Sequence, residues 1–125
     1  MEEFLVQAHS GIRWLVLVAL LATAVIAFMR SSGDTGPEGS WLQIVGGLFG
    51  LQVALGLIIY IVNQGWEMGG FIAYWHPIGM IAAIGIFHAG LGRGRKQGGG
   101  AGWRTIGLMT LLSLILVLAA IPWQR

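Results

Sequence analysis

The sequence predicts an all-α protein: an integral membrane, up-down four-helix bundle. Of the 125 residues, 56% are hydrophobic and only 10% are charged, too few polar side chains to cover a water-facing surface. The apolar residues fall into four runs, and each approaches the roughly 20 residues that a helix needs to cross a bilayer. The polar connections between the runs are short, so consecutive helices are expected to be antiparallel.

The predicted spans form one domain over residues 1–125, because a chain of this length is long enough for only one. We expect the spans at about residues 5–29, 41–63, 71–92 and 103–121. Lipid cannot satisfy an open backbone, so each span is expected to be helical. A polar loop is expected at 30–40 and a tight connector at 64–70. The basic, glycine-rich segment 92–100 is too polar to insert and predicts a third loop.

Charge and cysteine content narrow the function classes. The formal net charge is only +2, and the basic residues gather near the loops, so nucleic acid is not an expected partner. The chain has no cysteine, which excludes disulfides, thiolate metal sites and iron–sulfur clusters. The first and third connections carry most of the positive charge, from Arg30, Arg93, Arg95, Lys96 and Arg104. The positive-inside rule therefore predicts that both termini lie outside the cytoplasm.

Two histidines fall at matching depth in the predicted spans. His9 lies ~4–5 residues into the first span and His76 ~5–6 into the third, and at ~1.5 Å per residue their depths agree within a few ångström. In an up-down bundle these two helices face each other diagonally across the core. Two imidazoles placed in this way can ligate one haem iron from both faces. The alternative for each histidine is an interfacial side chain that is hydrogen-bonded to nearby backbone.

Three more polar side chains lie inside the predicted spans. Arg13 is one turn beyond His9 on the same helix face, and no acidic residue lies within a span to pair with it. Its expected partners are haem propionates or a quinone carbonyl, and the alternative is snorkelling to lipid headgroups. Gln52 is expected to point into the bundle, where it would join helices or contact a cofactor. His88 lies ~18 Å beyond His76 along the helix, so we expect an interfacial residue. The alternatives are proton exchange at a quinone pocket or a second, asymmetrically ligated cofactor.

A series of different short motifs lies along almost the whole chain. They are His9-Ser10-Gly11-Ile12-Arg13-Trp14, Leu51-Gln52 with Gly56-Leu57 and Tyr60, His76-Pro77 with Met80, Gly92-Arg93, and Ile121-Pro122-Trp123. In these motifs the chain resembles short four-helix bacterial membrane proteins of the cytochrome-b-like type. The resemblance implies a bacterial inner (cytoplasmic) membrane and a b-type haem, whose histidines correspond to His9 and His76. The chain departs from that pattern at Gly50, where relatives tend to carry histidine, and at His88.

These observations predict a small membrane b-type cytochrome with one haem b between His9 and His76, and with Arg13 and Gln52 beside the cofactor. It would pass electrons between the quinone pool and a partner, as a subunit of a larger respiratory-chain complex more than as an enzyme on its own. The expected partners are the lipid bilayer and other subunits of a membrane redox complex. One alternative is a cofactor-free accessory subunit of a respiratory or photosynthetic membrane complex. The other is a quinone-binding anchor without haem.

Overall fold

The computed structural model describes the 125-residue chain except residues 1, 38–39, 68, 71–73 and 122–125. Within the described residues the fold is all-helical, with four α-helices and no strand, which confirms the predicted all-α class. The helices are α1 (Glu2–Arg30), α2 (Trp41–Val62), α3 (His76–Gln97) and α4 (Gly99–Ala120). A short 3₁₀ helix, η1 (Gly65–Glu67), follows α2 in the connector that the sequence predicts.

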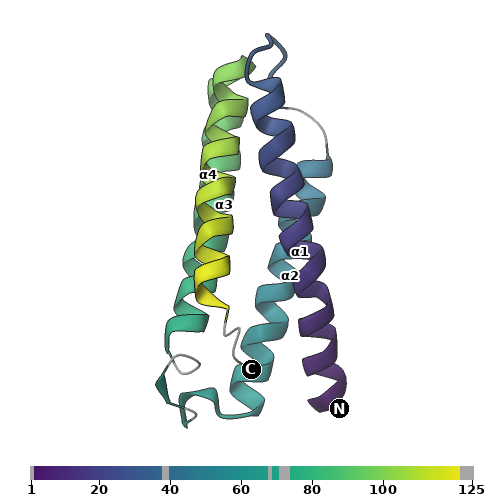
Figure 1. The fold of residues 1–125 in the computed structure, drawn as a ribbon, viewed down its shortest axis with the longest axis vertical. Coiled ribbons are helices and arrows are strands. Elements are labelled where there is room, and N and C mark those ends of the chain that lie inside the picture. The colour runs from purple at the N-terminus through teal and green to yellow at the C-terminus, as the bar shows by residue number, and fades with distance from the viewer. Residues whose placement is uncertain (1, 38–39, 68, 71–73, 122–125) are drawn as a thin grey trace.

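The helices run alternately up and down, and α1 begins near the end of the bundle toward which α4 runs, the lower end in Figure 1. The extensive contacts are those of α1 with α2, α2 with α3, α3 with α4, and α4 with α1. This ring of neighbours places α1 and α3 on a diagonal, as the sequence predicts. The upper end holds the loop between α1 and α2 and the turn between α3 and α4.

Three of the helices are long and apolar enough to cross a membrane: Glu3–Arg30, Trp41–Val62 and Gly99–Ala120. Their outward faces carry large apolar side chains, such as Val18 with 65% and Ile44 with 69% of its surface exposed. An outward face of this kind suits contact with lipid, so the chain has the character of a multi-pass membrane protein. Among the described residues α3 does not reach the same hydropathy, and the crossing expected at 71–92 stays a prediction.

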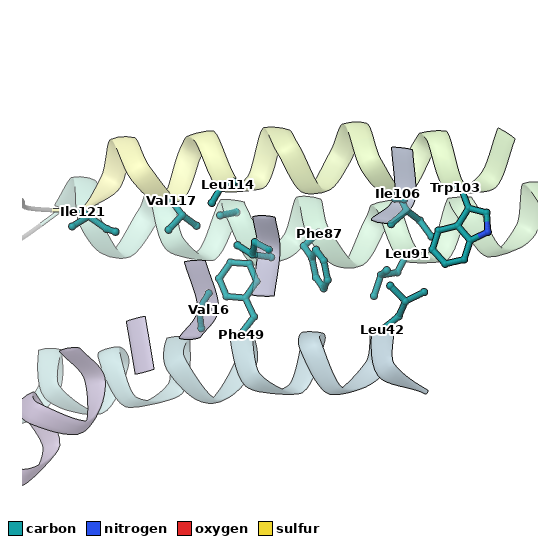
Figure 2. Close-up of a cluster of buried hydrophobic side chains, with 13 residues drawn as sticks. Val16, Leu42, Phe49, Phe87, Leu91, Trp103, Ile106, Leu114, Val117 and Ile121 are labelled. Atoms are coloured by element: carbon teal, nitrogen blue, oxygen red, sulfur yellow. The ribbon is translucent and has the colours of Figure 1, made fainter. Parts of the chain in front are cut away.

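The core is one apolar cluster that runs along the inside of the bundle. Figure 2 shows it extending from Trp103 past Phe87 to Val117 and Ile121. Helices α3 and α4 approach closely at Gly90, where an ideal Cβ would lie 2.5 Å from Cβ of Met109. Only a residue without a side chain permits this approach, which holds the α3–α4 pair as one tightly packed unit.

The segment 92–100, predicted as a loop, is helical except at Gly98. Helix α3 continues to Gln97 and α4 begins at Gly99, so the turn consists of Gly98 alone, with a φ of +69°. The prediction was wrong because polarity does not prevent a helix beyond the apolar span. Arg95 and Lys96 lie in the last turn of α3, where positive charge stabilises the negative end of the helix dipole.

Candidate functional site

A cavity of about 450 Å³ opens in the lower half of the bundle and is lined by residues of all four helices. Its volume is in the range of about 300–1,000 Å³ that is usual for cofactor and small-molecule sites. All four site residues that the sequence predicts lie on its wall: His9, Arg13, Gln52 and His76. The deeper end, toward the middle of the bundle, is apolar. The structure therefore brings residues of three helices into one site.

The imidazoles of His9 and His76 come together in this cavity. Their ring centroids are 6.3 Å apart and the ring planes lie at 82° to each other. A metal–imidazole bond is about 2.0–2.1 Å long, so two imidazoles on opposite sides of one metal have centroids roughly 6–6.5 Å apart. A direct edge-to-face ring contact falls in the same range, roughly 4.5–7 Å. The separation thus fits both a metal site and a plain ring contact.

The tautomer of His76 is set by the end of α4. Its Nδ1 lies 2.7 Å from the carbonyl oxygen of Ala120, which can only accept, so Nδ1 carries the proton. In the neutral ring Nε2 then keeps its lone pair, as a metal-ligating histidine requires. Ala120 belongs to the last turn of α4, whose carbonyls lack partners within the helix. The Nε1–H of Trp75 donates to the neighbouring Ala119 carbonyl at 3.2 Å. Together Trp75 and His76 cap the end of α4, so His76 also has a structural role.

His9 is held against one face of α2. An ideal Cβ at Gly56 would lie 3.0 Å from Cε1 and 3.5 Å from Nε2 of His9, so the imidazole packs directly on this glycine. One turn away on α2, Nε2 of Gln52 donates to the backbone carbonyl of His9 at 2.7 Å. His9 Nδ1 and Gln52 Oε1 are both buried and have no hydrogen-bond partner among the described residues. Nearly all buried polar groups have one, so this pair marks a site with unused bonding capacity.

Arg13 supplies the positive charge of the cavity. Its side chain is half-buried on the wall, and the guanidinium carbon lies 5.0 Å from the ring centroid of the neighbouring Trp14. None of the described residues that line the cavity is acidic. The site therefore combines apolar walls, two imidazoles and one guanidinium, a set that suits a flat apolar ligand with an anionic or carbonyl group.

His88 lies outside this cavity. Its side chain is exposed and packs against α2 at Gly46, where an ideal Cβ would lie 3.0 Å from Cε1. Among the described residues no group of three or more His, Asp or Glu could hold a metal ion on its own. His88 and the two cavity histidines are therefore separate.

Sequence reasoning missed the part that Gly56 and Ala120 play in the site. Gly56 had a detectable signal, because it follows Gln52 by four residues and so lies on the same face of α2. Ala120 had none, because its contact with His76 is made by a backbone carbonyl that every residue has. No family model matches the chain, and neither does any curated protein or solved structure.

Proposed function

We propose that this chain is a small membrane b-type cytochrome whose haem iron is ligated by His9 from α1 and His76 from α3. The observation that carries the proposal is the placement of two imidazoles 6.3 Å apart across a cavity of about 450 Å³. The hydrogen bond from Nδ1 of His76 to Ala120 supports it further, because it leaves Nε2 of that ring as the ligating atom.

The lining of the cavity fits haem b in its chemistry. The macrocycle supplies the other iron ligands, so two histidines are enough where an isolated metal ion would need more. Apolar walls such as Val16 and Phe49 suit the ring, and the guanidinium of Arg13 can pair with a propionate carboxylate. Held by His9 and His76, a haem would supply one-electron chemistry. The protein's part is to hold the two imidazoles, neutralise the acid group and exclude water.

The distribution of charge orients the proposed cytochrome in the bacterial inner membrane. The upper end of the bundle holds the basic residues named above, Arg30, Arg93, Arg95, Lys96 and Arg104. The positive-inside rule places that end in the cytoplasm and the His9–His76 cavity in the outer half of the bilayer. Electrons would pass between the quinone pool and a partner subunit of a larger redox complex.

The experiment is haem loading of the purified protein, with two variants at position 76. In His76→Asn the side-chain amide can still donate to the Ala120 carbonyl, but no Nε2 remains to bind iron. In His76→Ala both functions are lost. We expect a Soret band and a reduced-minus-oxidised difference spectrum for the wild type, and loss of six-coordinate low-spin haem in both variants. A wild type that binds no haem, or a His76→Asn variant with an unchanged spectrum, would refute the proposal.

The second candidate is a cofactor-free accessory subunit, which the structural contacts of the two histidines favour. His76 caps α4 and His9 packs on Gly56, so both rings already have roles in packing. In that case membranes that contain this chain alone give no haem difference spectrum, and His76→Asn is as stable as the wild type. A quinone-binding anchor, the third candidate, would instead retain quinone on purification and lose it in Arg13→Ala.

A further inference from the structure

Nδ1 of His9 and Oε1 of Gln52 are buried polar atoms that have no hydrogen-bond partner within the described part of the chain. Both belong to residues that are already joined, because Gln52 Nε2 donates to the backbone carbonyl of His9 at 2.7 Å. Gln52 is the one polar residue of α2 that is fully inside the bundle among the described residues, with 9% of its surface exposed. Buried polar groups rarely stay unsatisfied in proteins, so two such atoms on linked residues need an explanation.

The two atoms are complementary in their hydrogen-bonding capacity. An amide oxygen can only accept, whereas the Nδ1 of a neutral imidazole donates when it carries the proton. As the side chains lie, the two atoms do not bond to each other. If one side chain rotates to bring them together, a proton on Nδ1 of His9 would satisfy both atoms at once. It would also leave Nε2 of His9 with a free lone pair, the same state that the Ala120 carbonyl imposes on His76.

We propose that Gln52 is a positioning residue that accepts the Nδ1–H of His9 through Oε1 and so fixes the tautomer in which Nε2 binds iron. The assignment of Nε2 to iron rests on the proposed function, whereas the tautomer itself can be tested without haem. Gln52 thus acts through His9 and needs no contact with the cofactor.

Gly56 completes this arrangement on α2. It lies one turn from Gln52, on the same helix face, and the His9 ring packs on it with Cε1 3.0 Å from the position of an ideal Cβ. Gln52 would determine which nitrogen of the imidazole carries the proton, while Gly56 determines where the ring lies. Helix α2 carries no ligand of its own, and through these two residues it controls the ligand on α1.

The two axial ligands then differ in a way that can be measured. When the ring nitrogen that does not bind the metal donates a hydrogen bond, the imidazole becomes a more basic ligand and stabilises the oxidised metal. For His76 the acceptor is a backbone carbonyl, which substitution cannot remove. For His9 it is a side chain, so residue 52 tunes the midpoint potential of the site. Removing the acceptor should raise that potential, and any side chain that restores an acceptor should bring it back.

The experiment compares Gln52→Met, Gln52→Glu and the control Ser113→Ala in the full-length protein. Methionine has a similar length and no amide oxygen, whereas glutamate supplies an acceptor in either protonation state. Ser113 makes another buried bond between helices, from Oγ to the Ala83 carbonyl at 2.7 Å, and does not line the cavity. Each protein is titrated with ferric haem, and its midpoint potential is measured. The ¹⁵N resonances of His9 are recorded in the haem-free protein.

We expect Gln52→Met to bind haem about 10–100-fold more weakly and at a higher potential than the wild type. Gln52→Glu should restore the affinity to within a few fold, at or below the wild-type potential, and Ser113→Ala should match the wild type. A Gln52→Met variant that behaves like Ser113→Ala, or a Gln52→Glu variant as defective as Gln52→Met, would overturn the assignment. If the wild type binds no haem, the proposed function fails, but the ¹⁵N spectra still decide this inference. A proton on Nδ1 of His9 supports it, and a proton on Nε2 overturns it.

Discussion

Replacing Gly56 by alanine tests whether the His9 ring must pack closely against α2. The new Cβ would lie 3.0 Å from Cε1, 3.5 Å from Nε2 and 3.7 Å from Nδ1 of His9. Carbon atoms in favourable contact are about 3.5–4.0 Å apart, so the ring must move by roughly half an ångström or more. The movement is away from α2 and across the cavity, which changes the spacing between His9 and His76.

We expect this substitution to change haem binding much more than the stability of the fold. Alanine in place of glycine in a helix interior stabilises the helix by about 0.8–1.0 kcal/mol. The close contact with an imidazole at the cavity wall offsets part of this, so we expect the free energy of unfolding to change by less than about 1 kcal/mol. A site that needs its ligands within about 0.5 Å of their productive position loses affinity under the same shift. We expect haem to bind at least about 10-fold more weakly, which corresponds to a loss of about 1.4 kcal/mol of binding free energy.

Gly46 provides a matched control on the same helix. An ideal Cβ there would also lie 3.0 Å from the Cε1 of a histidine, in this case His88, which is exposed and outside the cavity. Haem affinity by Soret titration and unfolding by denaturant in detergent are measured for Gly56→Ala and Gly46→Ala. Equal haem affinities in the two variants would refute the reasoning, because the close contact would then matter only for packing.

Three further substitutions test separate parts of the structure. Gly90→Ala places a Cβ 2.5 Å from Cβ of Met109 and should destabilise the α3–α4 pair by about 1–3 kcal/mol in detergent unfolding, despite the gain in helix propensity. Trp103→Phe removes the Nε1–H bond to the Thr35 carbonyl, 2.9 Å long, and should cost about 1–3 kcal/mol in the same assay, because a buried ring also loses its polar anchor. Arg13→Gln should weaken binding of haem by about 10–100-fold, in line with about 1.5–3 kcal/mol for a hydrogen bond to a charged group, but leave binding of the haem dimethyl ester unchanged. Equal losses for the acid and the ester would mean that Arg13 does not pair with the propionates.

Most of the framework of the site could be predicted from the sequence, because it depends on regular geometry. Apolar runs give the helices, and a constant rise per residue gives the depths of His9 and His76. The alternating direction of the helices then places the two histidines on diagonal partners. Arg13 follows from the i, i+4 relation, and Gln52 from the cost of leaving an amide in an apolar span. All four residues line the same cavity.

The rest depends on how the helices are rotated about their own axes, which local sequence does not encode. The bond from His76 to Ala120 joins positions 44 residues apart and requires one particular packing of α3 on α4. The end of α3 was mispredicted for a related reason. The polar segment after Leu91 packs against α4, where an ideal Cβ at Gly94 would lie 2.5 Å from Cγ1 of Ile106.

The proposed haem site is consequently a property of the whole bundle and of no single motif. Helix α1 provides His9 and Arg13, α3 provides His76, and neither imidazole has its proton set by its own helix. For His76 the acceptor comes from the last turn of α4, and for His9 we propose that it comes from Gln52 on α2. A change that shifts α4 relative to α3, such as Gly90→Ala, should therefore alter the His76 ligand before the chain unfolds. A perturbation of α2 should act on His9 alone. If the proposed haem is bound, two ligands that respond to different helices would give two independent ways to adjust its potential.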